Sequence, residues 1–155
     1  MKLITTKDVL KHNPCNEWTE ERLKKKLGKG KTLLQILNMK SVSYADRIWC
    51  VTRFLPDKTN RKFAIWCARQ CKTDVQEITD YIDTTEKYYN GQATEDELSA
   101  AYSAADWAAD RATYSAAGWA AYRAAYWAEC RAAHSAAERK KQIAKLKELL
   151  KESEG

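Results

Sequence analysis

The sequence predicts an all-α protein, and three features of the chain support that prediction. Alanine occupies every fourth position from Ala100 to Ala136, and alanine has the highest intrinsic helix propensity. Only two prolines and five glycines occur among 155 residues, which leaves few turn residues for a sheet. No segment alternates apolar and polar residues long enough to predict a strand. We therefore expect a compact multi-helix bundle built around a long, alanine-rich C-terminal helix that is bent or broken.

Capping residues predict three short helices within residues 1–42. Asn13-Pro14 ends the first helix, and Gly28 ends the second. The segment Gly28-Lys-Gly-Lys-Thr32 resembles the end of a phosphate-binding loop, but Lys25 stands where that loop needs glycine and a helix precedes it. We therefore interpret this segment as a basic turn. A threonine begins each of the three helices, at Thr5 or Thr6, at Thr19 and at Thr32.

Residues 43–91 predict further helices. Ser43 begins a helix that ends at Leu55-Pro56. Thr59 or Asn60 begins the next, and helically spaced apolar residues allow it to continue as one helix to Asn90-Gly91.

The alanine-rich helix begins at Thr94, which forms a capping-box pattern with Glu97. A four-residue period advances about 40° per repeat, so the alanine stripe winds roughly once around the helix. This winding predicts a scaffold helix wrapped by other helices. A straight helix from Thr94 to Leu150 would span on the order of 85 Å, which is too long for a compact domain of this size. We expect a break at Gly118 or, as second choice, at Ala137-Glu138.

The length favours one domain over residues 1–155, with an N-terminal helical segment (1–42), central helices (43–91) and the alanine-rich helix with its basic tail (94–152). No apolar run reaches the roughly 18 residues of a membrane span, and the start lacks the apolar core of a signal peptide. Five cysteines without a secretory signal favour free thiols in a reducing compartment. We expect a cytoplasmic protein with no membrane partner.

The net charge of +6 conceals a segregation of charge along the chain. Residues 1–31 carry nine Lys or Arg against four Asp or Glu, whereas residues 73–110 carry one Lys against ten acids. Such asymmetry predicts either steering of a charged partner or contact between acidic and basic helices within the fold. The alternative for the acidic row is a solvated helix face. The candidate partner-binding residues form this row with a three-residue period: Asp74, Glu77, Asp80, Asp83 and Glu86.

Groups able to do chemistry are few. Cys67 with Cys71, and Cys130 with His134, are i, i+4 pairs that can chelate zinc if their helices cross. Packing as small buried side chains is the favoured alternative, so we predict no metal and no cofactor. Two histidines without a recognisable nucleophile signature predict that the protein is not an enzyme.

An Arg- and aromatic-rich stretch in the alanine helix predicts, as an alternative to packing, a cavity that stacks nucleotide bases. Its candidate ligand-binding residues are Arg111, Arg123, Arg131, Trp107 and Trp119.

Several motifs resemble those of a group of phage proteins. They are Asp46-Arg-Ile-Trp49, Arg61-Lys-Phe-Ala-Ile-Trp-Cys-Ala68, Tyr89-Asn-Gly-Gln-Ala-Thr-Glu-Asp-Glu-Leu98 and the alanine tetrads. Over about residues 44–137 the chain resembles small alanine-rich helical proteins of tailed bacteriophages and prophages, similar to a family labelled as immunity proteins. The resemblance implies an accessory protein of the phage, made in the cytoplasm of the bacterial host, that counters a host defence system. It carries over no catalytic residue.

Three functions follow as hypotheses, in this order. The first is an inhibitor that binds a host bacterial defence protein, in the manner of an anti-CRISPR protein. The second is a sponge that sequesters a nucleotide or short nucleic acid between its helices. The third is a small metal-binding protein. Self-association into a homo-oligomer is compatible with each of them.

Overall fold

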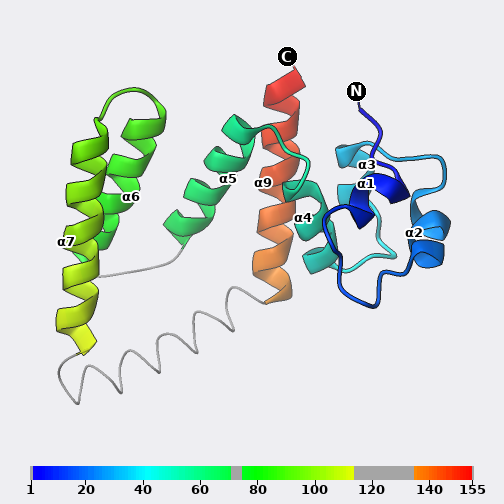
Figure 1. The fold of residues 1–155 in the computed structure, drawn as a ribbon, viewed down its shortest axis with the longest axis horizontal. Coiled ribbons are helices and arrows are strands. Elements are labelled where there is room, and N and C mark those ends of the chain that lie inside the picture. Colours follow the sequence, from blue (N-terminus) through cyan, green and yellow to red (C-terminus); the bar gives the residue numbers. More distant parts are fainter. Residues whose placement is uncertain (1, 71–74, 114–134, 155) are drawn as a thin grey trace. The chain divides into compact units, whose positions relative to one another are not determined.

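The computed structural model describes residues 2–70, 75–113 and 135–154, which fold into helices (Figure 1). Over these ranges no strand occurs, and the extended backbone pairs only in one isolated antiparallel bridge between Ile4 and Lys31. The predicted all-α class is therefore confirmed. The chain divides into two compact units, which we call unit 1 (Met1–Asn60 with Arg139–Gly155) and unit 2 (Arg61–Glu138). The unit boundaries therefore fall inside helices, and they differ from the three segments expected from the sequence.

Unit 1 contains four short N-terminal helices and most of the last helix. They are α1 (Thr6–Leu10), α2 (Glu20–Leu27), α3 (Leu33–Leu37), α4 (Tyr44–Thr52) and α9 (Ala136–Glu154). The predicted N-caps are confirmed, since the side chains of four residues each accept a hydrogen bond from the backbone N–H three positions later: Thr5, Thr19, Thr32 and Ser43. α1 packs with α2, and α3 with α4.

Aliphatic side chains form the core of unit 1. Ile4, Leu37, Val51 and Leu146 are all less than 2% exposed. On α9, the buried residues Ile143, Leu146, Leu149 and Leu150 follow a helical three-to-four-residue spacing, so one face of the basic tail is core. The segment from Gly28 to Thr32 is a turn between two helices, with Gly28 at φ 59°, which agrees with its interpretation as a basic turn.

The helix predicted to begin at Thr59 or Asn60 begins earlier, and its possible continuation as one helix to Asn90 does not occur. α5 (Asp57–Gln70) begins directly after Pro56. The Pro56 carbonyl accepts a hydrogen bond from the Asn60 N–H at 2.9 Å. Proline is favoured at the start of a helix because its φ is fixed near the helical value. α6 (Gln76–Tyr89) is a separate helix, since Val75 is extended at its N-cap. It ends at Asn90 and Gly91 as predicted, with Gly91 at φ 73°.

In unit 2, α6 packs along α7 (Glu95–Thr113), and the two form a hairpin (Figure 1). Ala105 and Ala108 of α7 are buried, whereas Tyr102 and Trp107 are 56% and 70% exposed. The prediction that helices wrap the alanine helix on all sides is therefore wrong over Glu95–Ala108. The buried alanines, three residues apart, give α7 one packed face. Tyr102 lies at the edge of that face, where its ring is 5.7 Å from the ring of Tyr81 on α6, and Trp107 is exposed.

A helix start lies beside one of the two predicted breaks. α9 begins at Ala136, where the Ser135 hydroxyl accepts a hydrogen bond from the Glu138 N–H at 3.1 Å. This start is next to the second predicted position, Ala137-Glu138. The first predicted position, Gly118, lies outside the described residues.

Candidate anion-binding groove

The loop between α3 and α4 carries a cluster of cationic and hydroxyl side chains. Asn38 ends α3, a turn closes where the Val42 N–H donates to the Met39 carbonyl at 3.0 Å, and Ser43 then caps α4. This short connection places Lys40 and Ser41 at the tip of the loop.

On α9, four residues share one helix face at the i, i+3, i+4 and i+7 positions. They are Lys140, Ile143, Ala144 and Lys147.

The loop and this face of α9 enclose a groove of about 810 Å³, which lies within unit 1. A volume of this size is typical of small-molecule sites, which span roughly 300–1,000 Å³. We call it the basic groove. Its lining residues are Leu37, Asn38, Lys40, Ser41, Val42, Ser43, Tyr44, Arg47, Lys140, Ile143, Ala144 and Lys147.

The electrostatics of the basic groove favour an anion. Its lining contains four cationic side chains and three hydroxyls, and none of its lining residues is Asp, Glu, His or Cys. The groove also lies at the N-terminus of α4, where the helix dipole favours negative charge. At that terminus Ser43 Oγ already accepts from the Asp46 N–H, and the Asp46 carboxylate lies in the first turn.

Arg47 anchors one wall of the groove. It is only 7% exposed, and its Nη1 donates to the Leu37 carbonyl at 2.8 Å while its Nε donates to the Ser43 carbonyl at 3.3 Å. Its guanidinium also lies 4.5 Å from the centre of the Tyr44 ring. These contacts hold a permanent positive charge next to the groove in one position.

Lys147 joins the other wall to the loop. Its Nζ donates to Asn38 Oδ1 at 2.5 Å, and Asn38 Nδ2 in turn donates to the Leu34 carbonyl at 2.9 Å. The end of α3 and the face of α9 are thereby linked, which sets the width of the groove.

A second cleft of about 470 Å³ lies at the other end of α4 and α9. Its lining includes the cations Lys2 and Arg53, together with Phe54, Leu150 and Ser153. Because this cleft adjoins the C-terminal ends of both helices, the helix dipoles there disfavour an anion. The basic groove is therefore the better anion site of the two.

A small apolar cavity of about 40 Å³ lies among α1, α2, α3 and α4. Trp18, Trp49 and Cys50 are among its lining residues. Burial raises the pKa of the Cys50 thiol from 9.0 to about 11, because the apolar surroundings disfavour the thiolate. This cavity offers volume but almost no polar group to a ligand.

Two residues of the predicted acidic row are paired within unit 2. Arg69 of α5 lies 2.5 Å from Glu86 Oε2 and 2.8 Å from Asp83 Oδ1, and these two carboxylates raise the pKa of its guanidinium further. Asp80 accepts a hydrogen bond from Gln76 Nε2 at 2.8 Å, and Glu77 also has an interaction. Asp74 lies outside the described residues. The sequence predicted either a charged partner or contact between acidic and basic helices within the fold. Asp83 and Glu86 show the second, because both contact Arg69 of α5.

The predicted base-stacking residues cannot be assembled from the described part of the chain. Trp107 is exposed on α7 and contributes to no groove described above. The remaining candidates fall outside the described side chains: Arg111, Arg123, Arg131 and Trp119.

Arginine stacks on aromatic rings elsewhere in the chain. Arg61 of α5 lies 4.7 Å from the ring centre of Tyr89 at the end of α6, a pairing that only the fold reveals. The other stacked pairs are Trp18 with Arg22, Tyr44 with Arg47 and Trp49 with Arg53. In each of these the arginine follows its ring by three or four residues, a spacing that was visible in the sequence.

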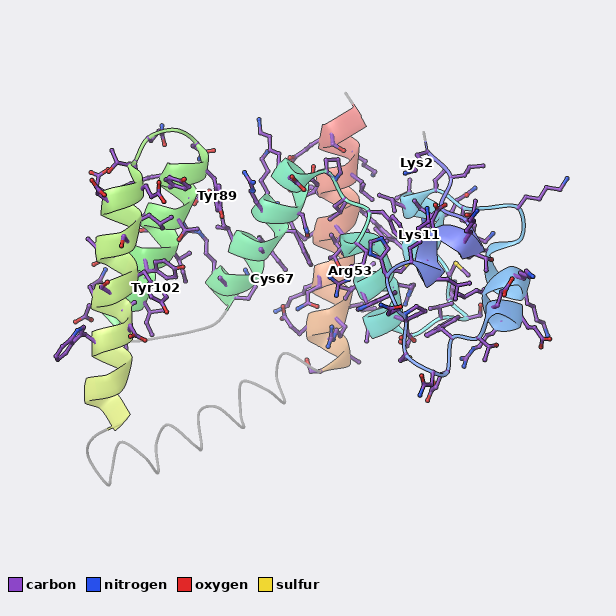
Figure 2. The ribbon with its side chains drawn as sticks, in the orientation of Figure 1. Lys2, Lys11, Arg53, Cys67, Tyr89 and Tyr102 are labelled. Atoms are coloured by element: carbon purple, nitrogen blue, oxygen red, sulfur yellow. The ribbon has the colours of Figure 1, made fainter. Side chains whose placement is uncertain are left out.

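One of the four metal candidates lies within the described residues. Cys67 is half-buried on α5 (Figure 2), and Cys71, Cys130 and His134 lie outside the described residues. No group of three His, Cys, Asp or Glu side chains suitable for a metal ion occurs in residues 2–70, 75–113 and 135–154. Nor is any helix in those ranges long and apolar enough to cross a membrane.

Comparisons with known proteins yield no relative. No protein-family model, curated protein or solved structure matches the chain. The resemblance to phage proteins therefore stays a prediction, and the case for function depends on the geometry of the chain itself.

Proposed function

We propose that this protein is a non-enzymatic binding protein that sequesters a phosphorylated ligand of the nucleotide class in the basic groove. One observation carries the proposal: a ligand-sized groove at a helix N-terminus is lined by four cations and three hydroxyls and by no carboxylate. This is the sponge hypothesis of the sequence, moved from the alanine helix to the α3–α4 loop and α9.

The lining suits binding rather than turnover. Lysine and arginine hold phosphate through charge and through several N–H donors, and the Ser41 hydroxyl suits a sugar or phosphate oxygen. The Ser43 hydroxyl is already used within the fold, since it donates to Asp46 Oδ2 at 2.7 Å. Arg47 and Lys147 are already held by hydrogen bonds, so less ordering is needed when a ligand binds.

Calorimetric titration with a nucleoside triphosphate tests the proposal. Reversing both Lys40 and Lys140 to Glu, at two exposed positions, should weaken binding by more than about tenfold, because two attractive charges become repulsive. The matched control reverses Lys25 and Lys29, which are exposed on and after α2 and do not line the groove. Equal loss in both double variants would mean that general charge, not the groove, binds the anion.

The inhibitor of a host bacterial protein is the second candidate. The observation that favours it is the exposure of three aromatic side chains on the α6–α7 hairpin: Tyr89, Tyr102 and Trp107. Exposed aromatic residues are enriched where proteins bind one another. If this candidate is correct, Trp107→Ala should abolish capture of a host protein from infected cells, while the reversal of Lys40 and Lys140 should leave capture intact.

A further inference from the structure

The α9 wall of the basic groove has an ordered pattern of charge. Lys140 and Lys147 are seven residues apart on one face, which separates their positions by about 10 Å along the helix. Between them, on the same face, lie Ile143 and Ala144. Along the helix axis, this wall therefore presents a cation, then apolar surface, then a second cation.

The opposite wall supplies matching chemistry. Lys40 and Arg47 bring two more positive charges, while half-buried Val42 adds apolar surface. Leu37 also lines this wall but is 0% exposed, so it belongs to the core beneath the groove. Tyr44 adds an aromatic ring, which already stacks with the Arg47 guanidinium. The groove thus offers positive charge at more than one point along its length, with apolar and aromatic surface between.

A single phosphate group cannot contact all the cations of the groove, because it occupies only one point along its length. In a stacked single strand, successive phosphates advance about 3.4 Å along the axis, so three steps span the separation of the two α9 lysines. The bases of such a strand are flat and apolar on their faces, and they stack on aromatic and apolar side chains.

From these features, and resting on the proposed function, we infer that the ligand is a short single-stranded oligonucleotide of about three or four nucleotides. Its phosphates contact Lys140 and Lys147 at the two ends of the α9 wall. Its bases lie against the apolar surface around Ala144.

Titration of the full chain with three probes tests the inference: inorganic phosphate, adenosine monophosphate and a tri-adenylate phosphorylated at both its 5′ and 3′ ends, whose four phosphates are separated by three steps. The tri-adenylate should bind at least about tenfold more tightly than the monophosphate, because it engages both ends of the wall. Lys140→Ala should lower the slope of log affinity against log salt for the tri-adenylate by about 0.7. Lys151→Ala, an exposed α9 lysine that does not line the groove, is the matched control and should leave that slope unchanged.

A second variant tests the middle of the wall. Ala144 is exposed, so Ala144→Glu introduces a carboxylate between the two lysines without entering the core, and it should abolish tri-adenylate binding. Ala136→Glu makes the same change at the exposed start of α9, beyond the groove, and should bind as the unchanged protein does.

The outcomes separate the two proposals. If the monophosphate binds as tightly as the tri-adenylate and Lys140→Ala leaves the salt slope unchanged, the oligonucleotide inference is wrong while the proposed function stands. If neither these three probes nor the nucleoside triphosphate binds, the proposed function fails, and the inference fails with it.

Discussion

Unit 1 and unit 2 are both helical, but they use charged side chains in different ways. In unit 1, aliphatic residues such as Leu37, Val51 and Leu146 fill the core, and no carboxylate lines the basic groove beside its cations. In unit 2, no residue of α6 is fully buried, and Arg69 joins α5 to Asp83 and Glu86 of α6. Unit 1 also has ion pairs, such as Lys24 with Glu20, but they lie outside the basic groove. The difference between the units is therefore that cations of unit 1 line an open groove, whereas Arg69 of unit 2 is neutralised by two carboxylates.

The contrast between the two units also makes the basic groove a better candidate binding site than the acidic row. The acidic segment has the larger local excess of charge in the sequence, yet two members of its row have an internal partner. The basic groove has fewer charges but arranges them around an open volume. For ligand binding, the position of the charges around an open volume therefore matters more than their number.

The largest expected effect concerns the core of unit 1. Leu146 has 0% of its surface exposed, so Leu146→Ala should lower the free energy of unfolding by about 2–5 kcal/mol through lost burial and a new cavity. Leu98→Ala, at a half-buried position of α7, should cost less. Chemical denaturation with both variants measures the difference, and an equal cost would remove the contrast between the two units.

The apolar surroundings of half-buried Cys50 should also slow its reaction with alkylating reagents. Because burial raises its pKa from 9.0 to about 11, its thiolate fraction near pH 8 is about 100-fold lower, and alkylation should slow accordingly relative to exposed Cys15. The stability gained from keeping this thiol neutral is complete below about pH 9 and is lost as the pH rises towards about 11. Peptide mapping after timed alkylation checks this; equal rates at the two cysteines would contradict apolar surroundings at Cys50.

A smaller effect is expected at the close packing of α6 with α7. Ala108 is buried, so Ala108→Leu should overpack this contact and cost about 1–3 kcal/mol. Ala104→Leu, at an exposed position of the same helix, should change the melting temperature little. Were both variants to melt like the unchanged protein, unit 2 would not depend on small residues at this contact.

The smallest effect is expected for the ion pairs of unit 2. Arg69 and its two partners are all partly exposed, and solvent screens such pairs, so Arg69→Gln should cost no more than about 1 kcal/mol. The cost should shrink further at high salt. Arg69→Lys, which keeps the charge but loses the planar fork of donors, is the control. A salt-independent loss well above this value would show that charge stabilises unit 2 more than we infer.

Several features of the fold were determined by local sequence alone. Threonine and serine at Thr5, Thr19, Thr32 and Ser43 mark helix starts, because a capping hydrogen bond joins residues only three apart. The same holds for Thr94, whose hydroxyl accepts from the Glu97 N–H at 3.2 Å. The apolar spacing between Thr59 and Asn90 allowed one continuous helix, but the structure has a separate helix, α6. Apolar spacing predicts which face of a helix is buried, and it does not predict where one helix ends and the next begins.

The basic groove was decided by tertiary structure only. One wall comes from residues 37–47 and the other from residues 140–147. The contact that joins the two walls, Lys147 to Asn38, links residues 109 positions apart in the sequence. The sequence showed α9 as a basic amphipathic helix, but which lysines meet a groove depends on how burial of Leu146 orients that helix. Local hydrogen bonds and propensity determine where helices begin, whereas the burial of apolar faces against distant segments determines which charges come together.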